Sequence, residues 1–124
     1  MKAFALLSIF LLLPVVAVAD ADGCTIGEPC TVEGVLRIFR TPPAPMGILE
    51  VEGTCIPLAL PDDVLADPKW RRNSSVTIVG VAHSHRGADL TDGVLSYELE
   101  GRNVIGSLCN ASPIVLFVTE IQTR

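Results

Sequence analysis

Residues 74–85, which read Ser-Ser-Val-Thr-Ile-Val-Gly-Val-Ala-His-Ser-His, constrain the fold more than any other stretch of the chain. β-Branched residues dominate the run, as is typical of a strand. Gly80 interrupts it, and a glycine inside a strand marks a bulge or the close approach of another backbone. We therefore expect a central β-strand here. Its end carries His83 and His85, the two histidines of the protein.

The N-terminal stretch has the pattern of a secretory signal peptide. A positively charged start precedes an apolar run at residues 3–16 and the small-x-small cleavage site Ala-Val-Ala at residues 17–19. The apolar run is short for a membrane span and lacks a charged flank, so we favour cleavage after Ala19 over a retained anchor. The sequence thus predicts a signal peptide over residues 1–19, a single domain over residues 20–124, and no membrane association after cleavage.

All four cysteines lie in the predicted domain: Cys24, Cys30, Cys55 and Cys109. An even number of cysteines in a small exported domain indicates two disulfides, and hence a periplasmic or secreted protein. Metal binding is the alternative, but the spacing of Cys24 and Cys30 fits neither a zinc knuckle nor a redox Cys-x-x-Cys motif. Three pairings are possible, and we favour Cys24–Cys30 with Cys55–Cys109.

The other hydrophobic runs predict strands over residues 31–40, 47–52, 54–60 and 114–121, with a hairpin over residues 94–108. Pro57 would place its strand at a sheet edge or at a bulge. Residues 61–72 are the only helical insert that the sequence suggests, with Asp62 and Asp67 as caps. We therefore expect an all-β protein, a small barrel of five to seven strands with one short helical insert.

This order of elements resembles the OB-fold, a small Greek-key barrel. Gly34 falls in the first strand, where that fold bends between two sheets, and the helical insert falls between the third and fourth strands. The layout is similar to that of small exported bacterial OB-fold proteins of the anticodon-binding-like group. The resemblance implies a ligand face near the first and fourth barrel loops. The chain departs from that pattern in a proline-rich first loop and in an extra hairpin before the last strand.

Charge argues against a nucleic-acid ligand. The net charge is −5, and removal of the signal peptide with Lys2 makes the domain more acidic still. Residues 46–60, which would form much of the ligand face of an OB-fold, contain no aromatic residue, lysine or arginine, but do contain Glu50 and Glu52. Binding of single-stranded nucleic acid needs basic side chains and aromatic stacking. We therefore expect a partner other than nucleic acid.

Trp70, Arg71 and Arg72 form the only cluster of basic and aromatic residues in the chain. Tryptophan and arginine are enriched at protein interfaces, so the cluster is a candidate partner-binding surface. In the alternative interpretation, which we favour, Trp70 covers one end of the barrel while both arginines face water.

His83 and His85 form the sharpest chemical feature. Alternate residues of a strand share a face, so both imidazoles could reach one Cu(II), Ni(II) or Zn(II) ion. Two ligands are fewer than the three that a zinc site normally needs, and Asp89 and Asp92 are the nearby residues that could complete it. Otherwise the two side chains are strand-end histidines without a metal, and we predict no cofactor.

No catalytic constellation accompanies these residues. Ser84 lies between two histidines, but neighbours on a strand point to opposite faces, so it cannot readily meet either imidazole. No nucleophile-elbow, zinc-protease or phosphate-loop motif occurs. We therefore expect an exported, non-catalytic binding or interaction module for a protein or peptide partner in the cell envelope. The alternatives are an envelope metal-binding protein that uses His83 and His85, and an OB-fold that binds oligonucleotides or oligosaccharides.

Overall fold

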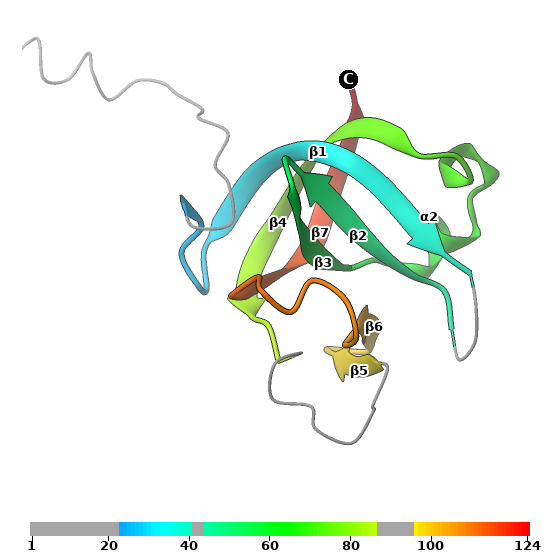
Figure 1. The fold of residues 1–124 in the computed structure, drawn as a ribbon. Helices are drawn as coiled ribbons and strands as arrows, with labels where there is room; N and C mark the ends of the chain where they lie inside the picture. Colours follow the sequence, from blue (N-terminus) through cyan, green and yellow to red (C-terminus); the bar gives the residue numbers. More distant parts are fainter. Residues whose placement is uncertain (1–22, 41–43, 87–95) are drawn as a thin grey trace, which may run out of the picture.

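The computed structural model describes residues 23–40, 44–86 and 96–124, so the predicted signal peptide at residues 1–19 and the prolines at 42–43 lie outside the described residues. Five strands close a barrel in the order β1-β2-β3-β7-β4 (Figure 1). The barrel strands are β1 (Pro29–Phe39), β2 (Met46–Val51), β3 (Thr54–Ala59), β4 (Ser74–Ser84) and β7 (Ile114–Thr123). The expected small all-β barrel is confirmed.

Strand β1 belongs to both sides of the barrel. Its first part pairs with β4, from Pro29 opposite Val81 onward, and its last part pairs with β2, ending with Phe39 opposite Met46. Gly34 lies at the change of partner. A Cβ atom there would collide with the Glu50 carbonyl oxygen and would lie 2.9 Å from the Leu49 side chain. The absence of a side chain therefore lets β1 bend tightly over β2.

Gly80 has the corresponding role in β4. The pairing of β4 with β7 shifts register between Val79 and Gly80, which is a β-bulge. A Cβ atom at Gly80 would lie only 2.7 Å from the backbone oxygen of Phe117. Both alternatives that the sequence suggested for Gly80, a bulge and a close backbone approach, occur together.

A short parallel pairing closes the barrel. Strand β3 meets β7 only at Leu58 and Ala59, opposite Leu116 and Phe117, while every other barrel pair is antiparallel. Pro57 comes just before this contact, so the first part of β3 pairs with β2 alone. The prediction that Pro57 lies at a sheet edge is therefore correct for the first part of β3, which has a single partner strand.

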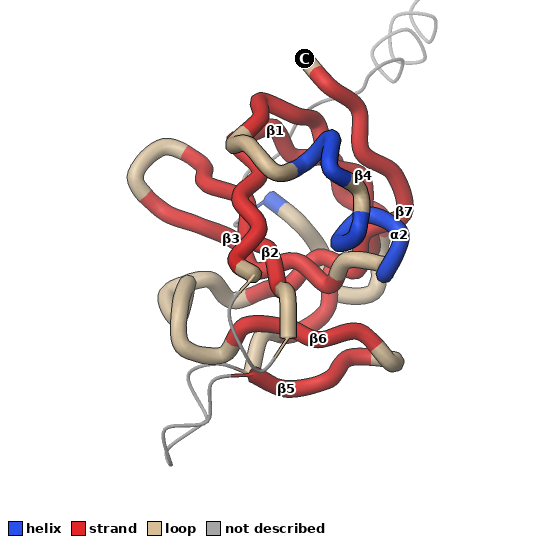
Figure 2. The backbone as a smooth tube through the Cα atoms, turned by 90° about the vertical axis from the view of Figure 1, so that its right-hand side faces the viewer, coloured by secondary structure: helices blue, strands red, loops and turns tan. Residues whose placement is uncertain are grey.

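One short helical insert, α2 (Asp62–Ala66) followed by the 3-10 turn η2 (Pro68–Trp70), lies between β3 and β4 (Figure 2). Leu65 and Trp70 bury their side chains in the main core. Asp67 caps η2 as expected, but the cap position of α2 is Pro61, and Asp62 is instead in the first helical turn. In the described part of the chain, no helix is long and apolar enough to cross a membrane.

The remaining hairpin, β5 (Ser96–Leu99) and β6 (Arg102–Ile105), is a separate two-stranded sheet outside the barrel (Figures 1 and 2). It turns at Glu100 and Gly101, both at positive φ, within the hairpin that the sequence predicted over residues 94–108. Arg102 anchors it: Nη1 donates to the carbonyl oxygens of Ala59 at 3.0 Å and Val118 at 2.8 Å, and the guanidinium lies 3.8 Å from the centre of the Phe117 ring.

Replacing Gly34 should weaken the barrel sharply. We expect Gly34→Ala to lower the free energy of unfolding by about 2–3 kcal/mol, because its methyl group would press against the β2 backbone. Gly53→Ala is the matched control, with open space around it but a positive φ, and should cost about 1 kcal/mol. Urea unfolding of both variants under non-reducing conditions measures the difference. Equal costs would show that the close approach at Gly34 is not limiting.

Candidate functional site

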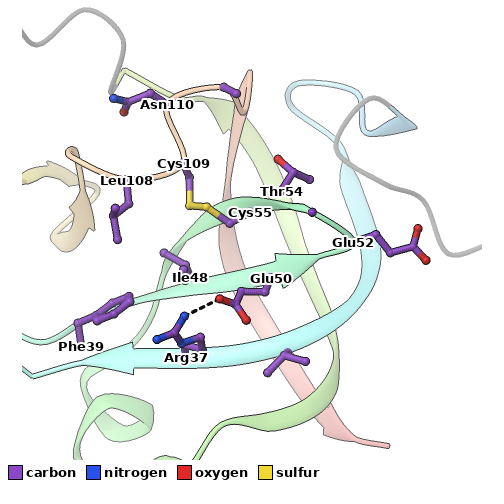
Figure 3. A pocket seen from close by; sticks show the side chains of 13 residues that line it. Arg37, Phe39, Ile48, Glu50, Glu52, Thr54, Cys55, Leu108, Cys109 and Asn110 are labelled. Carbon is purple, nitrogen blue, oxygen red and sulfur yellow. Dashed lines mark hydrogen bonds and ion pairs between the residues drawn. A yellow bond between two sulfur atoms is a disulfide. The ribbon is translucent and has the colours of Figure 1, made fainter.

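A groove of about 810 Å³ opens on the surface of the barrel. It lies between the outer face of the β1–β2–β3 sheet and the loop that joins β6 to β7 (Figure 3). Its lining consists of Val35, Arg37, Phe39, Ile48, Glu50, Glu52, Gly53, Thr54, Cys55, Leu108, Cys109, Asn110 and Ala111. In an OB-fold, this face and the fourth barrel loop are where ligands bind.

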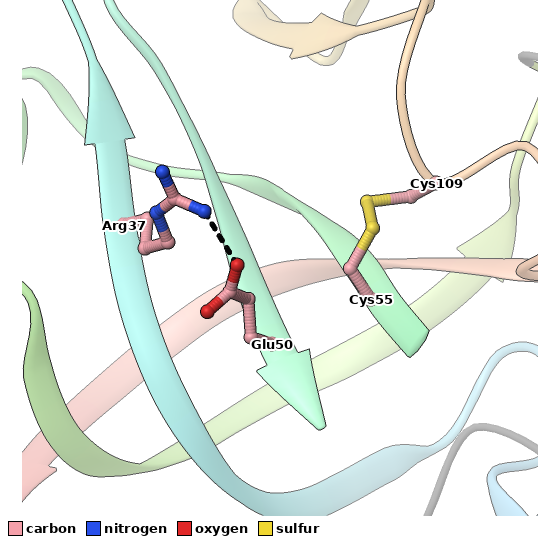
Figure 4. Close-up of polar contacts among 4 residues, drawn as sticks. All are labelled: Arg37, Glu50, Cys55 and Cys109. Carbon is pink, nitrogen blue, oxygen red and sulfur yellow. Dashed lines mark hydrogen bonds and ion pairs between the residues drawn. A yellow bond between two sulfur atoms is a disulfide. The ribbon is translucent and has the colours of Figure 1, made fainter. Parts of the chain in front are cut away.

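An ion pair crosses the floor of the groove, which is the outer face of strands β1, β2 and β3. Arg37 on β1 stands opposite Ile48 on β2, which makes Glu50 its diagonal neighbour, and Arg37 Nη1 donates to Glu50 Oε2 (Figure 4). The guanidinium also lies 5.3 Å from the centre of the Phe39 ring. The two charged side chains are 38% and 42% exposed, and such pairs contribute about 1 kcal/mol or less. The pair therefore orders the floor more than it stabilises the fold.

A disulfide holds the wall of the groove, which is the part of the β6–β7 loop at residues 108–111. Cys55 on β3 is bonded to Cys109 in the β6–β7 loop, with a Cα–Cα distance of 5.2 Å (Figures 3 and 4). That distance is usual for a disulfide. The bond holds the loop close to β3, the strand that carries Cys55.

Both favoured disulfide pairings occur in the structure, since Cys24 is bonded to Cys30 as well. No cysteine in the described residues is free. Two disulfides in a domain of this size indicate an oxidising, non-cytoplasmic environment.

The groove is chemically polarised along its length. Phe39, Ile48 and Leu108 gather at one end, while Glu52 stands at the other (Figure 3). Leu108 is 40% exposed, and Ile26 is the only other large hydrophobic residue of the described chain with its side chain in water. Leu108 therefore offers apolar surface to a ligand beside Phe39 and Ile48.

His85 lies behind the wall. It is only 8% exposed, its Nδ1 is 2.7 Å from the Tyr97 hydroxyl, and its backbone N–H donates to the Pro113 carbonyl. The Arg86 backbone N–H donates to the same hydroxyl at 3.2 Å. The simplest assignment has Tyr97 donating to Nδ1, which leaves the proton of the neutral ring on Nε2.

The environment of His85 opposes its protonation. Burial lowers its pKa below the usual value of about 6.5, and a weaker backbone interaction with Leu108 raises it. Nε2 is buried and, among the described residues, has no hydrogen bond of ordinary geometry. Burial also raises the pKa of Tyr97, so the pair is neutral near pH 7.

The two histidines have different surroundings. His83 is half-buried on β4, where its ring lies 6.1 Å from that of Phe117, whereas His85 is engaged with Tyr97. Within the described ranges, no group of three or more His, Cys, Asp or Glu side chains could hold a metal ion. Asp89 and Asp92 lie outside the described residues, so a metal site that includes them stays a prediction.

The cluster at residues 70–72 divides between core and surface. Trp70 is 7% exposed and belongs to the main core, while Arg71 and Arg72 are exposed. Lys69 adds a cation over the indole, with its Nζ 4.9 Å from the ring centre. Trp70 therefore has little exposed area to offer a partner.

Sequence reasoning missed Arg37, Phe39 and Leu108 as groove residues. Alternation places Arg37 and Phe39 on one face of their strand, and Glu50 and Glu52 share a face with Ile48. That signal was readable from the sequence. Leu108 carried no such signal, because its position depends on a loop held by a distant disulfide.

His85 should make the protein acid-sensitive. A base whose pKa is lowered in the folded state takes up protons more readily when unfolded, so stability falls as the pH drops below about 6.5. We expect His85→Gln to flatten this part of the stability curve, and His83→Gln to leave it steep. Urea midpoints measured between pH 8 and pH 5 provide the comparison. Parallel curves for wild type and His85→Gln would contradict the assignment.

The two disulfides should differ in their contribution. They close sequence separations of 54 and 6 residues. Chain-entropy arithmetic then gives about 4 kcal/mol for Cys55–Cys109 and about 2 kcal/mol for Cys24–Cys30. We compare two double alanine variants, one at Cys55 and Cys109 and one at Cys24 and Cys30. We expect the first to be less stable than the second by about 2 kcal/mol in urea unfolding. The reverse order would mean that the β6–β7 loop is held by other contacts.

Comparisons of the chain with protein-family models, with curated protein sequences and with solved structures find no match. The resemblance to OB-folds therefore rests on the barrel alone. What the protein does is inferred from the groove and from the side chains that line it.

Proposed function

We propose that this protein is an exported, periplasmic or secreted, non-catalytic module that binds a segment of a protein or peptide partner. The observation that carries the proposal is the groove of about 810 Å³ over β1, β2 and β3. It combines an exposed leucine and a half-buried phenylalanine with a polar floor, and its wall is held covalently. Concave sites of this size, mostly apolar with a few placed polar groups, are typical of binding sites.

We further propose that the barrel is an OB-fold. Four features support this assignment: the strand order β1-β2-β3-β7-β4, the glycine bend in β1, the short parallel closure between β3 and β7, and the helical insert before β4. The groove then coincides with the usual ligand face. The β5–β6 hairpin belongs to the fourth barrel loop and covers part of that face, through contacts of β6 with β2 and β3.

The chemistry of the groove favours a polypeptide over the other ligands of OB-folds. Its ionisable side chains are Arg37, Glu50 and Glu52, so it carries a net negative charge that repels phosphates. Phe39 is the only aromatic side chain in its lining, whereas single-stranded nucleic acids need several stacking surfaces. An extended peptide requires apolar contacts and hydrogen-bonding groups, and the groove has both.

Selection from ligand libraries tests the proposal. We expect the purified, oxidised protein to enrich peptides from a random display library, and Leu108→Lys to lose them, because a charge would replace the apolar contact at the rim. Arg71→Ala and Arg72→Ala are controls on a distant exposed surface and should retain the peptides. A random pool of single-stranded oligonucleotides and an oligosaccharide array are screened in parallel. Enrichment of either of these without peptides would overturn the proposal.

A further inference from the structure

The polarity of the groove specifies its partner more closely. Resting on the proposed function, we infer that the groove binds an extended polypeptide segment that carries an apolar side chain and, four residues away, a lysine or arginine. The apolar side chain lies between Phe39 and Leu108, and the cation lies at Glu52. Three observations support this arrangement: an unfilled apolar end, an unneutralised carboxylate at the other end, and the length between them.

The apolar end is only partly filled by the protein itself. Ile48 forms its base and is 4% exposed, while Phe39 is half-buried and Leu108 remains 40% exposed. All three line the groove, with Leu108 above Phe39 on the same side (Figure 3). A partner side chain placed there would remove the Leu108 surface from water, which is the favourable direction for apolar area.

The acidic end carries the charge that the groove does not balance internally. Arg37 neutralises Glu50, but Glu52 makes no ion pair among the described residues. The polar lining residues Thr54 and Asn110 are uncharged. Glu52 is exposed and sits at positive φ, followed by Gly53, in the two-residue turn that joins β2 to β3. A tight turn holds its backbone in place, so the carboxylate stays at this end of the groove and can meet a cation there.

The spacing follows from strand geometry. Ile48 on β2 and Glu52 in the turn that follows it both line the groove and are four residues apart, a span of about 13 Å at the rise of an extended chain. A peptide that lies along the strand in extended form has side chains with the same repeat. Its first and fifth residues therefore meet the apolar and acidic ends together. Between them, the peptide backbone lies over the Arg37–Glu50 pair, which has polar groups to offer.

Synthetic peptides test this arrangement directly. The probes are three blocked, fluorescently labelled peptides of Ser and Gly that contain Leu with, four residues later, Lys, Glu or Leu. Fluorescence anisotropy at low salt measures their affinity for the purified, oxidised protein. We expect the Lys peptide to bind at least tenfold more tightly than the Glu peptide. We expect Glu52→Lys to reverse that order, because it inverts the charge at one end of the groove.

A matched variant separates local from overall electrostatics. Glu98→Lys makes the same charge change on an exposed residue of β5 outside the groove lining, and should preserve the preference for Lys. Leu108→Ser should weaken all three peptides alike, and urea unfolding verifies that each variant is folded. If the peptides bind and depend on Leu108 but show no preference for Lys, the inference fails and the proposed function stands. If none binds, or if Leu108→Ser changes nothing, the proposed function fails with it.

Discussion

The close approach of two backbones at Gly34 is the constraint on which the rest of the structure depends. A barrel of five strands closes only if one strand serves both sides, and β1 does so by exchanging β4 for β2 as its partner. The exchange brings the β2 backbone to where a side chain would otherwise stand. Without this bend, Arg37 would not lie opposite Ile48 with Glu50 as its diagonal neighbour. The groove floor is therefore a consequence of barrel closure.

The groove wall is built by a different kind of interaction. The chain between β4 and β7 leaves the barrel, forms a hairpin, and returns, so two ties fix it against the outer face. One is the covalent bond between Cys55 and Cys109, and the other is the pair of hydrogen bonds from Arg102 to the carbonyls of Ala59 and Val118. Burial lowers the pKa of Arg102, which shows that its charge is partly withdrawn from water to make this contact. The wall is thus attached at Arg102, beside the hairpin turn, and at Cys109, after β6.

Much of the barrel was predictable from the sequence, because strands, glycine bends and disulfide spacing are local or nearly local signals. Gly34 and Gly80 were readable in this way, and so was the helical insert between β3 and β4. The groove was not, since it joins β1 and β2 to a loop far along the chain. The burial of His85 was also beyond the local pattern, which places it with His83. Its partner Tyr97 comes from a hairpin whose docking depends on tertiary contacts.

In the proposed binding mode, the floor and the two ends of the groove have different roles. An exposed ion pair contributes little to stability, but a ligand that covers Arg37 and Glu50 must remove water from both. An apolar ligand surface would leave those groups with less solvation and nothing in exchange, whereas a peptide backbone brings donors and acceptors of its own. In the proposed binding mode, the floor therefore discriminates against continuous apolar ligands, while the apolar end supplies affinity. The charge of Glu52 would then fix the direction in which a bound chain runs.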